Sequence, residues 1–365
     1  MDQPADHHSQ APQLPRGTYW GEAFSALRHH ALLLLAAAAV MGFGQWMSVV
    51  AGREISISIL AFIRNYVVIA GMIVVSAMII WKFGRMALVE KPSSPARHML
   101  HWLHADVFST IRLLNGFFGM TAILLLMTGF THAKNTVISF PGYNWDKQWE
   151  ALDRVLHLGA LPQDLLSPLL GGAWLTRGID LVYVSWYPVL FAALLIGAFQ
   201  PIRSLERHRY LLAVIFIIGI GGCVLAVSLA SAGPVYFGNM TGEPDPYAQH
   251  MALLRDIDRR FPLRALEIQQ SIWDERARGG TSFISAMPSM HVAIAALVAL
   301  ALWRLGGAAR IVSLSYAALI VIGSIHLGWH YAVDAYAGIL IAWAAWMAAL
   351  PISRWYLAMI GEGSA

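Results

Sequence analysis

Eight apolar runs constrain this chain more than any other feature of its sequence. They fall at 31–51, 58–82, 109–131, 178–199, 210–230, 290–305, 310–327 and 333–353. A helix needs about 20 apolar residues to cross a bilayer, and helices satisfy all their backbone hydrogen bonds within lipid. The composition agrees, because 58% of the residues are hydrophobic and 13% are charged. The sequence therefore predicts an all-α, polytopic membrane helix bundle of about eight spans, with re-entrant segments as an alternative for the short runs at 290–305 and 310–327.

Basic residues indicate the orientation of this bundle. They follow the second, fourth, sixth and eighth runs: Lys82, Arg85, Lys91, Arg97, Arg203, Arg207, Arg209, Arg304, Arg310 and Arg354. With eight spans all of these cations fall on one side, which the positive-inside rule makes the cytoplasm. Both termini then lie in the cytoplasm, and the long segments 132–177 and 231–289 lie outside. We expect an integral protein of the bacterial inner membrane whose outer face meets the periplasm or the medium.

The chain divides into four parts by composition. Residues 1–30 are polar and rich in Pro, Gln and His, which is typical of a disordered cytoplasmic tail. Residues 31–131 form the N-terminal spans, 132–177 an extracytoplasmic interfacial segment, and 178–355 the core of the membrane domain, including the outer segment 231–289. The net charge of +4 fits cytoplasmic loops beside anionic lipid, so we expect no nucleic-acid partner.

An amphipathic helix is predicted in the first outer segment, within "WDKQWEALDRVLHLG". Helical spacing places one set of side chains on its apolar face: Trp145, Trp149, Leu152 and Leu156. A second set falls mostly on the opposite face: Asp146, Lys147, Glu150 and Arg154. The pattern favours an interfacial helix that rests on the bundle as a lid, with direct substrate contact as the alternative.

Two polar stretches lie at the outer membrane face in this topology. "SAMPSMHVA" ends the second outer segment, and "HLGWHYAVDAYAG" (326–338) connects the last two spans. Ionisable groups at such a depth usually serve function. On a helix, Asp334 lies beside His330 and can fix its tautomer and raise its basicity, as a histidine nucleophile requires.

His291 and Ser289 complete this candidate site. His291 can protonate a leaving oxygen, and Ser289 with the free N–H groups of the same helix start can bind phosphate. Each residue also has a plain structural interpretation. Pro288 and Ser289 can simply begin a helix, and a lone interfacial histidine often caps a helix or binds a headgroup.

"AMPSMHVA", followed by "HYAVDAYAG", resembles the second and third signature motifs of the type 2 phosphatidic acid phosphatase superfamily. The resemblance is strongest to its inositol phosphorylceramide synthase and sphingomyelin synthase branch. It implies a six-helix catalytic core, His330 as a nucleophile that forms phosphohistidine, His291 as general acid, Asp334 as the residue that orients His330, and Ser289 as a phosphate ligand. It is specific over 285–340 and extends weakly to "WDKQWEALDRVLHLG", "RGIDLVYVSWYPVLF" and "GPVYFG".

The chain departs from the phosphatase members of that superfamily at two cations. Their first motif contains an Arg-Pro dipeptide, and no such dipeptide occurs in this sequence. Their third motif begins with Ser-Arg, but Ser324 stands six residues before His330. The transferase branch that this chain resembles also lacks these two phosphate-binding cations. Arg64 and Arg278 are the candidate replacements, although Arg64 can instead snorkel to the nearer interface.

Further substrate-binding candidates surround the motifs. They are Asp180, Tyr183 and Tyr187 in "RGIDLVYVSWYPVLF", Tyr236 in "GPVYFG", and His326. Tyrosine at a membrane interface is also common without any such role.

We therefore expect a phosphotransferase that acts on lipid-linked phosphate or phosphodiester substrates at the outer leaflet through a phosphohistidine. A lipid phosphate phosphatase of the same superfamily is the alternative. A metal-dependent hydrolase is a weaker one, since His326, His330 and Asp334 would share a helix face with His291 nearby, but Gly328 argues against a continuous helix. A transporter with titrating histidines is another. The expected partners are membrane lipids and the lipid-linked substrate, without cofactor or metal, while donor, acceptor and oligomeric state stay open.

Overall fold

The computed structural model describes residues 19–53, 68–137, 139–140, 143–201, 203–278 and 285–362. These residues form helices and connecting turns, and no strand occurs among them. The α-helices are α1 (Tyr19–Val50), α3 (Ile69–Arg85), α4 (Pro95–Trp102), α5 (Thr110–Lys134), α6 (Asp146–Leu156), α7 (Pro162–Leu170), α8 (Ala173–Val184), α9 (Trp186–Phe199), α10 (Leu205–Phe216), α11 (Ala226–Ser228), α12 (Phe237–Thr241), α13 (Ala248–Arg260), α14 (Arg264–Ala277), α15 (Met290–Leu302), α16 (Gly307–His326) and α17 (Ala332–Met359). The predicted all-α bundle is confirmed.

Seven helical segments of the described chain are long and apolar enough to cross a membrane. They are Trp20–Val50, Gly71–Glu90, Thr110–Lys134, Ala173–Phe199, Leu205–Ser228, Gly307–His326 and Ala332–Met359. The shorter apolar helix Met290–Leu305 corresponds to the remaining predicted run, 290–305. The first span begins earlier than its apolar run, since α1 starts at Tyr19 and residues 19–30, expected in the tail, are helical. Residues 1–18 of that tail lie outside the described ranges.

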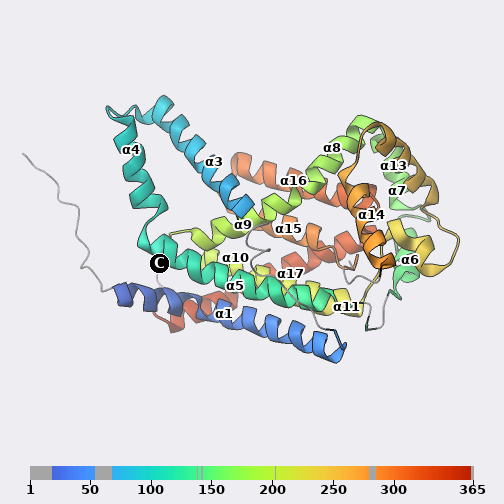
Figure 1. Cartoon of the computed structure of the whole chain (residues 1–365), viewed down its shortest axis with the longest axis horizontal. Helices are drawn as coiled ribbons and strands as arrows, with labels where there is room; N and C mark the ends of the chain where they lie inside the picture. The colour runs from blue at the N-terminus through green and yellow to red at the C-terminus, as the bar shows by residue number, and fades with distance from the viewer. Residues whose placement is uncertain are drawn as a thin grey trace, which may run out of the picture.

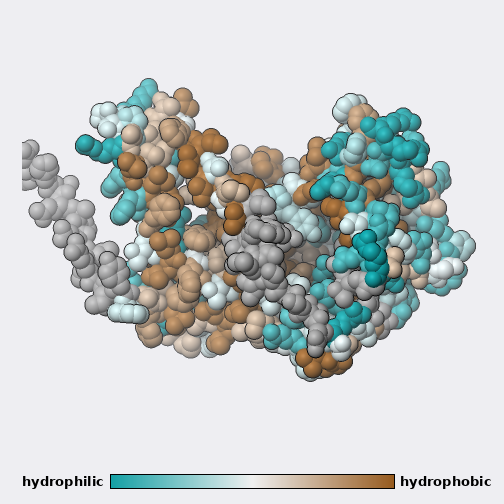
Figure 2. All heavy atoms as spheres, viewed as in Figure 1, coloured by the Kyte–Doolittle hydropathy of each residue, from teal (hydrophilic) through white to brown (hydrophobic). Residues whose placement is uncertain are grey.

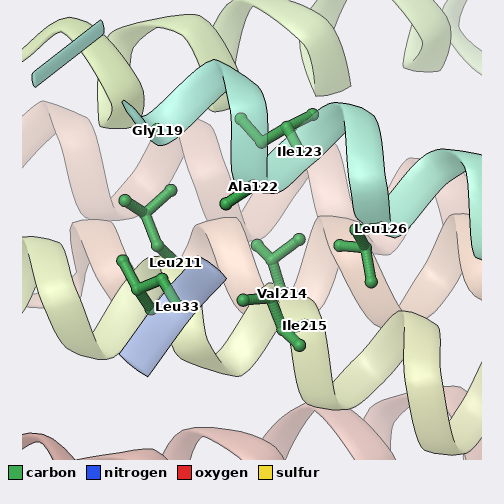
Figure 3. A pocket seen from close by; sticks show the side chains of 8 residues that line it. All are labelled: Leu33, Gly119, Ala122, Ile123, Leu126, Leu211, Val214 and Ile215. Carbon is green, nitrogen blue, oxygen red and sulfur yellow. The ribbon is translucent and has the colours of Figure 1, made fainter. Parts of the chain in front are cut away.

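Small residues allow α1 and α5 to lie side by side along one edge of the bundle (Figure 1). A Cβ atom on Gly129 would meet the backbone of Val40 and Met41, so only glycine fits this helix crossing. Where α10 joins the pair, Figure 3 shows eight residues around a small apolar pocket: Leu33, Gly119, Ala122, Ile123, Leu126, Leu211, Val214 and Ile215. Close van der Waals packing, rather than the hydrophobic effect, drives the association of these helices, because lipid is as apolar as the side chains.

The polar helices gather at one end of the bundle. In Figure 1, α6, α7, α13 and α14 lie together beyond the ends of the spanning helices. Figure 2 shows hydrophilic side chains over α13 and α14, whereas hydrophobic side chains dominate over α1 and α5. This outer cap contains the described part of the two long segments expected outside the membrane. It covers the end of the bundle at which α17 begins.

The opposite end holds both described ends of the chain and a group of buried polar side chains. The Tyr356 hydroxyl donates to the Arg28 carbonyl at 2.5 Å, and His29 pairs with Glu362. Arg207 is buried and donates to the Gly197 carbonyl at 2.7 Å and the Ala198 carbonyl at 2.7 Å. These carbonyls belong to the last turn of α9, where intrahelical donors are lacking, so Arg207 caps that helix.

Candidate active site

The two motif stretches meet where α15 and α17 begin. The Ser289 N–H donates to the Asp334 carbonyl at 3.0 Å. Gly338 permits this contact, because a Cβ atom there would lie 2.6 Å from the Ser289 carbonyl oxygen and 3.2 Å from the Ala293 nitrogen. The last glycine of "HYAVDAYAG" thus lets the backbones of α15 and α17 approach closely.

His330 lies in the turn before α17 and is held by two carbonyl groups. Its backbone N–H donates to the Ser324 carbonyl at 3.0 Å, and its Nδ1 is 2.8 Å from the Ala286 carbonyl oxygen. A carbonyl can only accept a hydrogen bond, so Nδ1 carries the proton in this geometry. The Nε2 atom therefore keeps its lone pair, which is the state that a nucleophilic imidazole needs.

Asp334 lies beside His330, as the spacing predicts, but by a different local structure. His330 precedes the first residue of α17, Ala332, so the two side chains do not share a helix face. The Oδ2 atom of Asp334 accepts the Tyr331 N–H at 2.9 Å and lies 3.4 Å from Nδ1 of His330. Asp334 is fully buried, and it forms a capping box with Tyr331 at the start of α17. The Ala286 carbonyl makes the shorter contact with Nδ1, and Asp334 adds a negative charge next to it.

His291 faces His330 across the site. The centroids of the two imidazole rings are 6.2 Å apart. The ring of Tyr183 stacks on His291 with centroids at 5.0 Å, and the ring of Trp186 lies at 4.1 Å. Tyr187 meets it edge to face at 5.9 Å. The break between α8 and α9 brings these three aromatic side chains around one histidine.

Ser289 is the N-cap residue of α15. Its Oγ accepts the Val292 N–H at 3.4 Å, and the side chain is fully buried. Ser289 therefore caps the start of α15, which is the plain structural interpretation given above. The first N–H groups of a helix have no intrahelical acceptor, so the start of α15 still offers donors to an anion beside His291.

Two aspartates of α6 that were not among the predicted site residues hold the turn that carries His330 in place. Asp153 accepts the N–H groups of Ala332 at 2.8 Å and Val333 at 2.9 Å, which are the first donors of α17. Asp146 accepts the Tyr331 hydroxyl at 2.7 Å. It also accepts the N–H groups of Ala232 and Gly233, each at 3.0 Å.

Asp146 was expected with the charged residues opposite the apolar face, yet it is buried against the bundle. Asp146 is 1% exposed and Asp153 is fully buried, because each finds backbone donors from the bundle. Their seven-residue spacing, two helical turns, was the signal in the sequence. Burial raises the pKa of the Asp146 carboxyl above its ordinary value and that of Asp153 to about 6.

The other predicted residues divide into those near the histidines and those with contacts elsewhere. Tyr183 and Tyr187 contact His291, as described. Asp180 is buried away from the histidines, where it accepts the N–H groups of Arg264 at 3.0 Å and Ala265 at 2.8 Å and pairs with Arg177 at 2.9 Å. Asp180 thus caps α14 and fixes the cap to α8.

Tyr236 and Arg278 line a cavity of about 900 Å³ between α12, α13 and α14. The Tyr236 hydroxyl donates to the Gln269 carbonyl at 2.7 Å, and its ring stacks on Trp273. No described contact joins either residue to His330 or His291. Arg64 lies outside the described residues.

His326 ends α16 and turns toward the outer cap. Its Nε2 lies 3.0 Å from the Thr176 hydroxyl, and its carbonyl accepts from Nε2 of His250 at 2.7 Å. Gly328, with φ +75°, separates it from His330, so His326, His330 and Asp334 do not share a helix. Among the described residues no group of three or more His, Cys, Asp or Glu side chains is placed to hold a metal ion.

Comparison with known proteins gives one match. A family model described as the PAP2 superfamily matches residues 149–348, which is more than half of the chain. The matched range begins on α6 and contains Asp153, His291, His330 and Asp334. No curated protein and no solved structure matches the chain.

Proposed function

The chain belongs to the PAP2 superfamily, and we propose that it is a membrane-embedded phosphotransferase that acts on lipid-linked phosphate or phosphodiester substrates. Membership of this superfamily and the apolar helices support a membrane enzyme with phosphatase-like chemistry. Its resemblance to the inositol phosphorylceramide synthase and sphingomyelin synthase branch favours transfer to an alcohol over hydrolysis. In this proposal Nε2 of His330 is the nucleophile.

One observation carries the mechanism. The Ala286 carbonyl lies 2.8 Å from Nδ1 of His330 and so directs the imidazole lone pair to Nε2. The ring centroids of His291 and His330 lie 6.2 Å apart, so both histidines are close enough to act on one phosphoryl group. Positioning of this kind supplies much of the rate in phosphoryl transfer.

The first half-reaction forms a phosphohistidine. Nε2 of His330 attacks phosphorus while the bond from phosphorus to the leaving oxygen breaks, and His291 gives its proton to that oxygen. His330 gains a positive charge as the new P–N bond forms. The buried carboxylate of Asp334, 3.4 Å from Nδ1, stabilises this charge.

The second half-reaction restores the enzyme. An acceptor hydroxyl gives its proton to His291, now the base, as its oxygen attacks phosphorus and the P–N bond breaks. An alcohol acceptor gives a new phosphodiester or phosphomonoester, and water gives the phosphatase reaction. Both use the same residues, so the acceptor decides between the proposed function and its alternative.

The site is proposed to face the outer leaflet. Arg203, Arg207 and Arg304 lie toward the end of the bundle opposite His330, with both described ends of the chain. This distribution supports cytoplasmic termini and a periplasmic or external site, by the positive-inside rule. A bacterial inner membrane is the proposed location.

Product analysis tests the proposal. Purified protein is incubated with phosphorus-labelled bacterial lipids, with and without an added chelator, beside the variant His330→Ala. We expect label in a new lipid or glycan, with or without chelator, and none from the variant. Label released only as inorganic phosphate would establish the phosphatase instead. Product formed equally by His330→Ala would refute the histidine nucleophile, and product lost with chelator would favour metal-dependent chemistry.

A further inference from the structure

A lysine ends α5 at the same end of the bundle as the proposed catalytic histidines. Lys134 is the last residue of this helix and follows Phe130 by one turn, so the two side chains share a helix face. Lys134 is a further candidate, beside Arg64 and Arg278, for the phosphate-binding cations missing from the motifs. Lys134 was overlooked because it belongs to an early span, more than 150 residues before His291 in the sequence.

Glycine packing shows which way that face of α5 is directed. A Cβ atom on Gly222 would lie 2.8 Å from the Phe130 ring and 3.5 Å from Sδ of Met290. Phe130 and Met290 therefore meet over the same glycine, and Met290 directly precedes His291. The face of α5 that carries Phe130 and Lys134 is thus turned toward the start of α15.

The charges around Lys134 agree with this placement. Its ammonium group interacts electrostatically with the His291 imidazole and with Glu275 of α14. Within the described ranges Lys134 has no salt bridge and no side-chain hydrogen bond, whereas Lys82 and Lys147 each pair with a glutamate at 2.8 Å and 2.6 Å. Lys134 is half-buried.

A partly buried cation that forms no salt bridge within the described residues suits a phosphoryl oxygen. Charge-assisted hydrogen bonds to phosphate are among the stronger polar contacts, and they strengthen where water is excluded. The start of α15 presents backbone N–H donors to the same space. Lys134 and this helix start can therefore hold the equatorial oxygens while His330 and His291 act along the reaction axis.

We infer that Lys134 binds the phosphate group of the substrate and so replaces the cations absent from the motifs. The inference rests on the proposed function for its substrate, a lipid-linked phosphate ester, and on the packing of α5 against α15 for its geometry. Lys134 then contributes both to ground-state binding and to stabilisation of charge during transfer.

The experiment compares Lys134→Met, Lys134→Arg and the control Lys147→Met, which removes a lysine paired with Glu243 on the surface. Inorganic phosphate is titrated into each purified protein by calorimetry, since this binding needs no turnover. KM and kcat are measured with the labelled lipid substrate, and thermal unfolding is followed for each variant. We expect Lys134→Met to weaken phosphate binding by roughly tenfold or more and to raise KM, with the unfolding midpoint unchanged. Lys134→Arg should retain most of both properties, and Lys147→Met all of them.

The outcomes separate this inference from the proposed function. If the wild type turns over lipid in a His330-dependent way while Lys134→Met keeps its KM and phosphate affinity, the assignment of Lys134 is wrong and the function stands. If phosphate binding depends on Lys134 but no His330-dependent product forms, the anion site stands and the proposed reaction is wrong. Equal loss of binding in Lys134→Met and Lys134→Arg, with a lowered unfolding midpoint, would assign Lys134 a structural role instead.

Discussion

Nδ1 of His330 lies 2.8 Å from the carbonyl oxygen of Ala286, two residues before the proline of the other motif. The backbone of "AMPSMH" fixes the tautomer of the histidine in "HYAVDAYAG". That relationship determines which nitrogen is free to react.

The phosphorylated intermediate should carry its phosphoryl group on Nε2 of His330. Nδ1 is occupied by the Ala286 carbonyl, so only Nε2 presents a lone pair. Alkaline quenching during turnover, followed by mass spectrometry and phosphorus NMR, distinguishes the two phosphohistidine isomers. Phosphate on Nδ1, or on His291, would contradict this geometry.

Gly338→Ala should lower activity at least tenfold and destabilise the protein by about 1–3 kcal/mol. The added Cβ would lie 2.6 Å from the Ser289 carbonyl, and overpacking of backbone against backbone costs about that much. Turnover and chemical unfolding measure the two effects. The matched control is Gly178→Ala in α8, where a Cβ meets nothing within 4 Å, and it should behave as wild type. Full activity in Gly338→Ala would show that the motifs tolerate a wider separation.

Asp153→Asn should remove a pH-dependent part of the stability. The pKa of Asp153 is raised to about 6 in the folded protein, above the value near 4 expected when unfolded, so the folded state binds the proton more tightly. The contribution of Asp153 is thus most favourable at low pH and falls as pH rises from about 4 to 6, by up to about 3 kcal/mol.

Urea unfolding of wild type and Asp153→Asn across pH 4–8 measures this difference. Between about pH 4 and 6 the wild type should lose stability relative to the variant. Above about pH 6 the difference in the free energy of unfolding should be constant. The control Asp256→Asn replaces a half-exposed side chain that pairs with Arg259 and should cost less than about 1 kcal/mol. A difference that instead grows in favour of wild type as pH rises would mean that ionised Asp153 is the stabilising form.

Arg207→Met should destabilise the bundle by about 3 kcal/mol without changing KM. The substitution leaves the buried carbonyls of Gly197 and Ala198 without their donor. Arg304→Ala is the comparison, because its pair with Glu206 is solvent-exposed and should contribute less than about 1 kcal/mol. Unfolding in detergent and substrate kinetics test both. A shift in KM for Arg207→Met would indicate coupling across the membrane domain.

The spanning helices and the meeting of the two motifs could be predicted from the sequence. Hydropathy locates the spans, and the distribution of basic residues places both motifs at the same membrane face. The spacing of His330 and Asp334 also indicated that they are neighbours. It could not show that the helix begins after His330, since this depends on a capping box at Tyr331 and on the left-handed Gly328.

The residue roles that could not be predicted from the sequence depend on contacts between distant segments. Asp180 resembled a headgroup ligand, but the backbone donors at Arg264 and Ala265 come from a helix 84 and 85 residues away. Lys134 has no motif around it, and its inferred role follows only from the packing of Phe130 and Met290 over Gly222. Such placements depend on the tertiary fold, and no local pattern encodes them.

The position of α6 has a consequence for control of the enzyme. This helix lies outside the spanning helices, yet Asp146 and Asp153 on its inner side hold the residues next to His330. Its outer side is accessible, with Val155 74% exposed. Displacing α6 would therefore remove the acceptor of the first N–H groups of α17, so the turn that carries His330 depends on a helix outside the bundle.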